Sequence, residues 1–200
     1  MSPSTDTYDR ILASAKELMH ASSYADVGVA AICEHAQVKK GSFYHFFPSK
    51  QELTLAVLDD IYADFKQAII DQAFTSALPP LQRLEKFAEL AIELQTSIHE
   101  QTGVVMGCPL GNLASELSTQ DETIRKKIDT LFIRLRRGIG EALQAAVERG
   151  EIEAVDTDAT ALAILSYFEG TMLMAKTQND PSILRHLLPA AAHIRIPLTH

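Results

Sequence analysis

Apolar residues recur at intervals of three and four along nearly the whole chain, a pattern typical of helices that bury one face. The longest such run, residues 121–149, keeps this spacing for about seven turns and ends at a helix-stopping Arg149-Gly150 pair. No segment shows the alternation expected of a half-buried strand. The sequence therefore predicts an all-α protein, with helices over residues 6–21, 28–36, 38–44, 50–74, 80–101, 110–117, 121–149, 157–177 and 181–192.

Composition excludes several classes of protein. The 200 residues are 46% hydrophobic, which is enough to bury a core, and two cysteines cannot build a disulfide framework or an all-cysteine zinc site. His186 and His193 make a poor metal site by themselves, so we expect no metal and no cofactor. No apolar run reaches the roughly 20 residues of a membrane span, and the N-terminus lacks the features of a secretory signal. We expect a cytoplasmic protein without a membrane partner.

Charge is distributed unevenly along the chain. The formal net charge is −8, yet residues 1–50 carry five basic and five acidic side chains, so the excess lies entirely in residues 51–200. The segment 38–50 holds three lysines and His45 but no acidic residue. Such a segment attracts a polyanion that the rest of the chain repels. The alternative is a chance cluster on a solvated turn, and charge alone does not decide between the two.

The first part of the chain has the dimensions of a helix-turn-helix unit, in which two short helices are joined by a tight turn. The string after this turn is more specific than the spacing. It reads Lys40-Gly41-Ser42-Phe43-Tyr44-His45-Phe46-Phe47-Pro48-Ser49-Lys50 and is followed by Glu52-Leu53. The upstream frame consists of Arg10-Ile11-Leu12, Ala15, Tyr24, Val29, Ile32 and Ala36. Over residues 8–55 the chain resembles the DNA-binding part of TetR-family transcriptional regulators.

This resemblance implies a domain organisation, a partner and the roles of single residues. It implies a helix-turn-helix DNA-binding domain in residues 1–48 and a helical domain for ligand binding and dimerisation in residues 49–200. The implied partner is double-stranded operator DNA of palindromic sequence, with the helix at 38–44 in the major groove. The implied DNA-binding residues are Gly28, Lys39, Lys40, Gly41, Ser42, Tyr44, His45 and Lys50. Among them, Gly41 allows close approach to the duplex and Lys50 meets a backbone phosphate.

Three positions depart from the family pattern. The second helix usually begins with a threonine or serine whose hydroxyl holds a phosphate, but Val27-Gly28 stand there, so only backbone N–H groups remain. Gln37 replaces the usual turn glycine, and Lys39 replaces a serine. These changes concern the operator preference rather than DNA binding itself. The side chains expected in the core of the small domain are Cys33, Phe43 and Phe47.

The helix at 157–177 is apolar on nearly every side and carries several small residues. A helix that is apolar all round must be covered on all sides. Together with the helix at 121–149 it has more apolar surface than one domain of this size covers, which favours a homodimer joined by a four-helix bundle. The alternative is that both helices lie in the core of a single protomer.

A second informative string is Met106-Gly107-Cys108-Pro109-Leu110-Gly111-Asn112. Proline favours the first helical position, which makes Cys108 the N-cap of a short helix. A helix N-terminus stabilises a thiolate, so the pattern predicts a thiol with a lowered pKa. A Gly-Cys pair ahead of a short helix also resembles a branch of the family that responds to electrophiles and oxidants. The alternative is a small buried residue whose thiol takes part in no chemistry.

Further residues of the second domain are candidates for an effector pocket, although methionine and aromatic side chains at helical spacing are more typical of a core. Lys176 either neutralises the dipole of its helix while reaching water or lies near the pocket. The candidate effector-sensing residues are Cys108, Met106, Phe87, Phe132, Tyr167, Met172 and Lys176, with Phe168 and Met174 as further lining candidates.

The sequence shows no enzymatic constellation. Ser42 has no acid–base partners, and no glycine-rich phosphate loop is present, so we expect no enzyme. The pattern predicts a ligand- or electrophile-responsive DNA-binding transcriptional regulator, a repressor of the TetR type, in which a small-molecule effector changes the separation of two reading heads. The alternative is a small all-α ligand-binding protein or enzyme whose basic segment is incidental.

Overall fold

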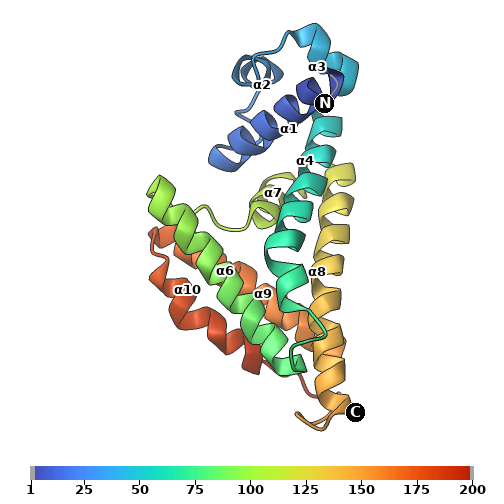
Figure 1. Ribbon diagram of the computed structural model, residues 1–200, viewed down its shortest axis with the longest axis vertical. Coiled ribbons are helices and arrows are strands. Elements are labelled where there is room, and N and C mark those ends of the chain that lie inside the picture. The colour runs from blue at the N-terminus through green and yellow to red at the C-terminus, as the bar shows by residue number, and fades with distance from the viewer. Residues whose placement is uncertain (1–2, 199–200) are drawn as a thin grey trace. The chain divides into compact units, whose positions relative to one another are not determined.

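The computed structural model of the protein describes residues 3–198, with side chains from residue 6 onward. Its elements are α1 (Pro3–Ala21), α2 (Val29–His35), α3 (Lys40–Phe46), α4 (Lys50–Phe65), a π-helical turn (Lys66–Ile70), α5 (Asp71–Ala73), α6 (Pro80–Thr102), α7 (Pro109–Leu117), α8 (Glu122–Glu148), α9 (Thr157–Gln178), α10 (Ser182–Leu187) and a 3₁₀ turn (Leu188–His193) (Figure 1). No strand forms within residues 3–198, where an isolated antiparallel bridge joins Val155 and Pro197. The prediction of an all-α fold is confirmed.

The chain packs as two compact units. The first contains the described residues up to Ala63 together with Pro109–Asp129, and the second contains Asp64–Cys108 together with the described chain from Thr130 onward. Helices α4 and α8 contribute to both units, because the boundaries fall inside them. The first unit therefore combines the three N-terminal helices with the first part of α4, α7 and the start of α8.

The core of the first unit is built from the apolar faces that the sequence spacing predicts. Ile11 of α1, Ile32 of α2 and Phe43 of α3 are each fully buried. Phe47 is also buried, and the ring of Tyr8 stacks on it with centroids 4.9 Å apart. Burial of an aliphatic or aromatic side chain of this size contributes about 2 kcal/mol. The predicted core positions of Phe43, Phe47 and the buried Cys33 are confirmed.

The turn between α2 and α3 contains a residue in the left-handed region. Gln37 has a φ of 53° at the position where the family usually has glycine. A non-glycine residue in this region costs about 1 kcal/mol, so the turn needs external support. Arg10 of α1 supplies it by donating hydrogen bonds to the carbonyl groups of Ala36 and Gln37, the latter over 3.0 Å. These hydrogen bonds stabilise the turn in the absence of a glycine at position 37.

Several helix ends follow the predicted capping residues. The Oγ atom of Ser49 accepts a hydrogen bond from the backbone N–H of Glu52 over 3.0 Å, which is one half of a capping box. Pro80 occupies the first turn of α6. Gly150 ends the α8 segment with a φ of 68°, a conformation that favours glycine.

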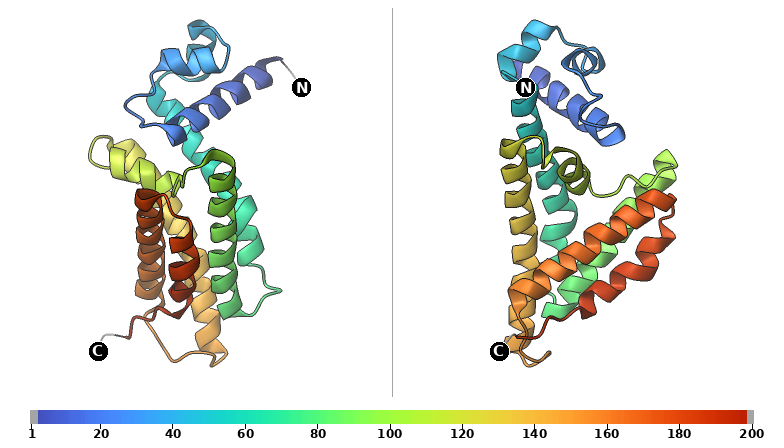
Figure 2. Two further views of the ribbon diagram at one scale, coloured as in Figure 1. Left: turned by 90° about the vertical axis from the view of Figure 1, so that its left-hand side faces the viewer. Right: turned by 180° about the vertical axis from the view of Figure 1, so that it is seen from behind.

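The helices of the second unit pack around a cluster of phenylalanine rings. Figure 2 shows α6, α9 and α10 running side by side. The ring of Phe87 from α6 lies 5.0 Å from that of Phe168 in α9 and 5.5 Å from that of Phe74. Ile139 and Leu143 of α8 are fully buried in the same cluster. The cluster thus joins helices that are up to about 90 residues apart along the chain.

Helix α9 is apolar on nearly every side, yet the protomer buries only one of its faces and leaves another exposed. Ile164, Phe168 and Met172 are buried on the inner face. Leu162 and Leu173 are 49% and 56% exposed on the outer face. Apolar side chains on that face are therefore exposed in the protomer. Within the described part of the chain, no helix combines the length and apolar character that crossing a bilayer requires.

The segment predicted as one helix over residues 50–74 is helical as far as Ala73, but it is not α-helical throughout. A π-helical turn over Lys66–Ile70 separates α4 from α5. A π turn inserts one extra residue into an α-helix and so rotates the following face. As a result Ala68, which the 3.6-residue spacing places inward, is exposed, while Ile69 is buried.

Two further helix boundaries differ from the prediction. Helix α3 begins at Lys40 and extends to Phe46, so Lys39 is its N-cap rather than part of a helix over 38–44. The predicted helix over 181–192 becomes the short α10 followed by the 3₁₀ turn. Pro189 lies in that turn, and because it lacks an N–H group it cannot donate the hydrogen bond that would continue α10.

Candidate nucleic-acid interface and sensing segment

Helix α3 presents a basic face to solvent. Five of the predicted DNA-contacting residues, Lys39, Lys40, Gly41, Tyr44 and His45, are exposed, and Ser42 is half-buried. No acidic side chain of residues 6–198 forms an ion pair with either lysine. Both positive charges are therefore available to a phosphate or a base edge.

The opposite face of α3 anchors it in the first unit. The Phe43 side chain has no exposed surface, and the ring of Tyr44 meets it edge-on with centroids 5.2 Å apart. The backbone N–H of Val38 donates to the carbonyl of Cys33 over 2.9 Å and ties α3 to the end of α2. The exposed side chains thus project from a helix whose position is fixed by packing, as a reading helix requires.

Gly28 is the N-cap of α2. It is exposed, its backbone is extended (φ −80°, ψ 157°), and no side chain caps the helix. The first N–H groups of a helix have no intrahelical acceptor, so they suit a phosphate oxygen. The backbone contact implied for Gly28 stays a prediction.

Lys50 lies in an environment that the sequence did not indicate. Its Nζ donates a hydrogen bond to the carbonyl oxygen of Tyr24 and lies 3.7 Å from the centroid of the Tyr24 ring. The side chain is half-buried, and burial lowers the pKa of its ammonium group. The ammonium is thus engaged by protein groups, and its contact with a phosphate stays a prediction.

Substitution of Gly41 by alanine is expected to affect the thermal stability of the protein and its affinity for the operator in opposite directions. A Cβ at Gly41 would meet no atom within 4 Å, and alanine is favoured over glycine in a helix by up to about 1 kcal/mol. We expect Gly41→Ala to keep or raise the melting temperature but to weaken operator binding about tenfold, because the methyl group faces the duplex. Thermal unfolding and operator titration of the same preparation check this. Unchanged operator affinity would show that the duplex does not approach Gly41.

The segment between α6 and α7 is held by hydrogen bonds from two helices. Asn179, the left-handed C-cap of α9, accepts from the N–H of Val105 over 2.8 Å and donates to the carbonyl of Gly103 over 3.0 Å. Gln95 of α6 donates from Nε2 to the carbonyl of Gly107 over 3.1 Å. Gly107 has a φ of 74°, which favours glycine. These contacts fix the backbone that leads to Cys108.

Cys108 is a free, half-buried cysteine directly before α7, and Pro109 is the first residue of that helix as predicted. Its thiol forms a hydrogen bond with the carboxyl group of Glu169 in α9, a bond that favours the charged carboxylate. Burial has the larger effect and raises the pKa of Glu169. A neighbouring carboxylate disfavours a thiolate whereas a helix N-terminus favours it, so the lowered pKa of Cys108 stays a prediction.

The other cysteine is placed as expected. Cys33 is buried in the first unit, and burial raises the pKa of its thiol, an effect that the charge of Lys40 partly offsets. Because the thiolate is the reactive form, Cys33 is the slower of the two cysteines if Cys108 ionises more easily.

The remaining candidate effector residues fall into two groups. Phe87, Phe168 and Met172 are buried in the core of the second unit, and Phe132 and Tyr167 pack partly buried against it. Met106 is half-buried in the Cys108 segment, whereas Lys176 and Met174 are exposed near the end of α9. The core alternative is confirmed for the first group, and whether any of these residues touches an effector stays a prediction. Among the residues with described side chains, no group of three His, Cys, Asp or Glu is placed to hold a metal ion.

Comparison with known families identifies the chain. The model of the "Bacterial regulatory proteins, tetR family" matches residues 11–57, and that of the "Tetracyclin repressor-like, C-terminal domain" matches residues 80–191. The chain belongs to the TetR family. As a TetR-family protein it is a DNA-binding transcriptional regulator, and the alternative of an all-α carrier or enzyme with an incidental basic segment is not favoured.

Relatives and solved structures agree with this assignment. The transcriptional regulator AcuR of Cereibacter sphaeroides is 34% identical over 80% of this chain and 72% of AcuR. The repressor NemR of Escherichia coli is 30% identical over 72% of this chain and 69% of NemR. The structure of a regulatory protein TetR from Rhodobacter sphaeroides has a TM-score of 0.82 at 29% identity, covering 95% of this chain and 99% of that chain. The TetR fold thus extends over nearly the whole chain.

Sequence reasoning missed two polar residues beside Cys108. Gln95 is 4% exposed, and its Oε1 atom is buried without a hydrogen-bond partner. Glu169 is half-buried in the middle of α9. A single carboxylate in an otherwise apolar stretch is a signal that could have pointed to Glu169. No comparable local signal marks Gln95, because polar residues are common on α6.

Proposed function

We propose that this TetR-family regulator is a homodimeric repressor that binds a palindromic operator through α3 of each protomer and releases it when a small-molecule effector binds the C-terminal region. The observation that carries the DNA-binding part is the exposed, acid-free basic face of α3 over the buried Phe43. We propose residues 1–48 as the DNA-binding domain and residues 49–200 as the regulatory and dimerisation domain, acting on DNA in the cytoplasm. Family models over residues 11–57 and 80–191 support a DNA-binding part followed by a regulatory part.

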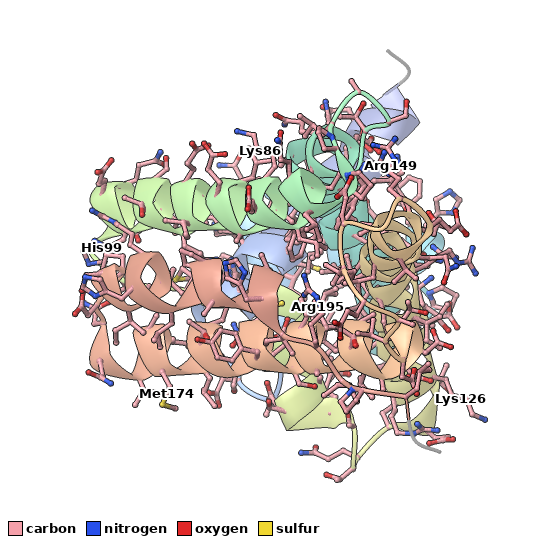
Figure 3. All side chains as sticks on the ribbon, turned by 90° about the horizontal axis from the view of Figure 1, so that it is seen from below. Lys86, His99, Lys126, Arg149, Met174 and Arg195 are labelled. Carbon is pink, nitrogen blue, oxygen red and sulfur yellow. The ribbon has the colours of Figure 1, made fainter. Side chains whose placement is uncertain are left out.

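The outer face of α9 supports the homodimer. Leu162, Ser166, Gly170 and Leu173 are exposed and share one side of the helix. Met174 lies beside them, and its side chain points away from the neighbouring helices (Figure 3). Exposed apolar side chains beside small residues suit a second copy of the same helix, because a two-fold axis brings each patch onto itself. A four-helix bundle with α8 is the expected arrangement.

Dimerisation explains how an effector could control DNA binding. The two α3 helices of a dimer must reach half-sites about 34 Å apart, one turn of the duplex. In one state of the dimer the separation of the heads matches the half-sites, and in the other it does not. An effector that binds the second state more tightly than the first reduces operator affinity, by a factor set by the difference between the two effector affinities. Because the operator itself favours the DNA-binding state, effector and operator weaken each other's binding reciprocally.

Unbiased selection tests this function. The full-length protein is incubated with a pool of random duplexes, and bound sequences are enriched and sequenced. We expect a palindromic consensus and an affinity that falls steeply with salt, with a slope of about −0.9 per neutralised phosphate. A screen for compounds that release the selected duplex then identifies the effector class. Enrichment of no sequence, or binding that is insensitive to salt, would contradict the regulator function.

We also propose that Cys108 is the sensing residue for small electrophiles. With iodoacetamide as the probe, the thiolate sulfur forms a bond to the CH₂ carbon, iodide leaves with the electron pair of the broken C–I bond, and the thiol proton goes to solvent. The adduct adds volume to a half-buried position whose backbone is fixed by Asn179 and Gln95. Overpacking of this kind destabilises the existing arrangement by about 1–3 kcal/mol.

Single-cysteine variants test the sensing role. We expect iodoacetamide to modify Cys108 before Cys33 and to release the operator, while Cys108→Ser keeps operator binding and loses the response. Glu169→Gln should accelerate the modification at pH values at which Glu169 is ionised, because it then removes a negative charge beside the thiol. The measurements are mass-spectrometric labelling rates against pH, run beside operator titration. Labelling of Cys108 without release, or equal rates for both cysteines, would contradict this role.

A further inference from the structure

The segment that leads into α2 is bound by a carboxylate from a distant helix. The backbone N–H of Tyr24 donates to Oε2 of Glu116 over 2.9 Å, and the N–H of Ala25 donates to Oε1 of the same residue over 2.9 Å. Glu116 belongs to α7, more than 90 residues further along the chain but in the same compact unit. It lies outside residues 11–57, which the DNA-binding family model covers. One carboxylate thus uses both oxygens on two consecutive peptide groups.

Lys50 holds the same segment from the other side. Its Nζ donates to the carbonyl oxygen of Tyr24 and lies over the Tyr24 ring. Burial lowers the pKa of this ammonium group, and the charges of Glu116 and Asp26 partly offset that effect. Tyr24 is therefore bound through its N–H, its carbonyl and its ring. We call the group of Tyr24, Ala25, Lys50 and Glu116 the Tyr24 clamp.

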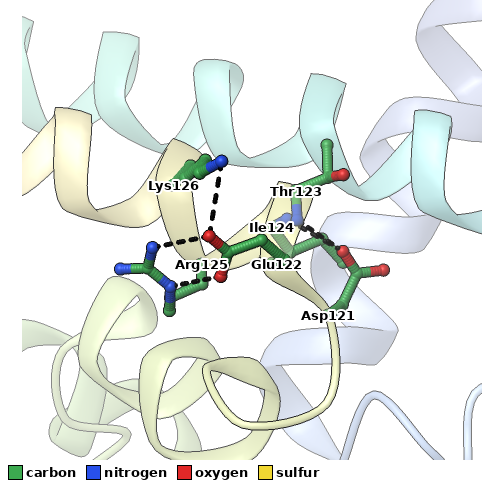
Figure 4. A network of polar contacts seen from close by, with 6 residues as sticks. All are labelled: Asp121, Glu122, Thr123, Ile124, Arg125 and Lys126. Carbon is green, nitrogen blue, oxygen red and sulfur yellow. Dashed lines mark hydrogen bonds and ion pairs between the residues drawn. The ribbon is translucent and has the colours of Figure 1, made fainter.

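The start of α4, which carries Lys50, is itself fixed. Gln51 donates from Nε2 to Oδ2 of Asp121 over 2.6 Å. Oδ1 of Asp121 accepts the N–H groups of Thr123 and Ile124 over 2.9 and 3.0 Å and so caps α8 (Figure 4). The capping carboxylate thus joins α4 to the first turn of α8.

The neighbouring polar contacts complete this framework. Glu122 binds Arg125 through two hydrogen bonds of 2.6 and 2.8 Å and pairs with Lys126 (Figure 4). Nζ of Lys127 pairs with Asp59 of α4 over 2.6 Å. The Tyr24 clamp therefore rests on α7 and on a part of α4 that is tied to α8, not on the reading helices themselves.

The clamp matters because α2 lacks a cap of its own. Gly28 offers no side chain to its N-terminus, so the path of Tyr24 and Ala25 sets where α2 begins. Helix α2 is in turn linked to α3 through Val38 and Cys33. A shift of the clamped segment is thus transmitted to the reading helix, and misplacement by about 1 Å is enough to lose contacts to base edges.

We propose that Glu116 is a positioning residue for operator recognition, which acts through Tyr24 and Ala25 to set α2 and α3, and that Lys50 serves in this clamp rather than as a phosphate contact. This inference rests on the proposed DNA-binding function. It assigns part of the reading unit to α7, beyond the segment that resembles the family's DNA-binding motif.

The sign of the effect of Glu116→Gln separates positioning from electrostatics. Removal of a negative charge alone makes DNA binding slightly tighter, because it reduces repulsion of the duplex. The clamp predicts that Glu116→Gln weakens operator binding. Glutamine retains one acceptor oxygen, but its NH₂ group faces a backbone N–H donor and cannot accept that hydrogen bond. We expect operator binding about tenfold weaker, with non-specific duplex binding unchanged or tighter. Glu100→Gln removes the same charge from an exposed position of α6 and is the matched control.

Lys50→Ala supplies an independent measurement that does not depend on the stability of the glutamate variant. A lost phosphate contact reduces the slope of log K against log salt by about 0.9, whereas a lost clamp lowers operator affinity at an unchanged slope. Lys39→Ala removes an exposed cation, unpaired among the described residues, next to the reading helix and is the reference for the slope change. Lys50→Arg keeps a cation over the Tyr24 ring and should restore most of the affinity.

The possible outcomes distinguish this inference from the proposed function. If the wild-type protein binds no selected duplex, the DNA-binding function fails. If the wild type binds and Glu116→Gln binds as well or better, the role of Glu116 is overturned. Equal losses of operator and non-specific binding, together with a lowered melting temperature, indicate a purely structural role and also overturn it. If Lys50→Ala reduces the slope of log K against log salt by about 0.9, Lys50 contacts a phosphate and its role in the clamp is overturned.

Discussion

The double substitution Lys39→Glu and Lys40→Glu is expected to abolish operator binding while leaving the fold intact. Both side chains are exposed and form no ion pair among the described residues, so their reversal buries no charge and breaks no contact of that kind. Each contact to a base edge contributes about 1–3 kcal/mol, so loss of two contacts and the new repulsion from phosphates weaken binding by at least about a hundredfold. Fluorescence anisotropy titration of a labelled operator at several salt concentrations measures this.

The matched control for this change reverses two lysines elsewhere, of which Lys66 is exposed and Lys86 is half-buried. Lys66→Glu and Lys86→Glu alter the net charge by the same amount, but both residues belong to the second unit (Figure 3 labels Lys86). We expect the control to lower operator affinity only slightly, through the long-range field of the protein. If both double variants lose binding equally, the effect is one of net charge and α3 is not the reading helix. Circular dichroism confirms that each variant is folded.

Replacement of Leu173 by glutamate is expected to convert the dimer to monomers. Leu173 is 56% exposed on the outer face of α9, so glutamate is tolerated in the isolated protomer. In a two-fold interface the change removes two buried leucines at about 2 kcal/mol each and places two like charges near one another. The dimer dissociation constant should rise at least about a hundredfold, and operator binding should fall with it because the two heads are no longer linked. Sedimentation velocity at micromolar concentration measures the monomer fraction.

A second variant and a control refine this experiment. Gly170→Arg should have the same effect, since Gly170 is exposed and a Cβ there meets no atom within 4 Å in the protomer, so the arginine side chain can extend into solvent unless a partner covers this face. Leu94→Glu replaces a leucine that is 37% exposed on α6 and should leave the dimer intact. A wild-type protein that sediments as a folded monomer would contradict the homodimer directly.

The helices and many of their ends were predictable because their signals are local. The spacing of Ile11, Ile32 and Phe43 places each on a buried face, and the structure buries all three. Ser49 caps the start of α4 and Gly150 ends α8, and each acts on groups only a few residues away. The π-helical turn at Lys66–Ile70 was not predictable, because one inserted residue changes no local propensity and is tolerated only where the packing of the following helix requires it.

The candidate sites divide in the same way. The exposure of Lys39, Lys40 and Tyr44 followed from a contiguous motif, since residues of a single short helix share their faces by geometry. The surroundings of Lys50 and Cys108 did not, because their partners come from distant parts of the chain. The local sequence alone indicates a phosphate ligand for a lysine next to a helix start.

The sequence by itself determined the helical elements, the TetR-type reading motif and the apolar residues of both cores. Each of these depends on interactions within about four residues or on the tendency of an apolar side chain to avoid water. Only the tertiary structure decided which polar groups meet: Glu116 with Tyr24 and Ala25, and Glu169 with Cys108. These groups lie more than 60 residues apart in the sequence. Their pairing depends on how the amphipathic helices pack, and hydrogen bonds require an accuracy of a few tenths of an ångström that no local pattern specifies.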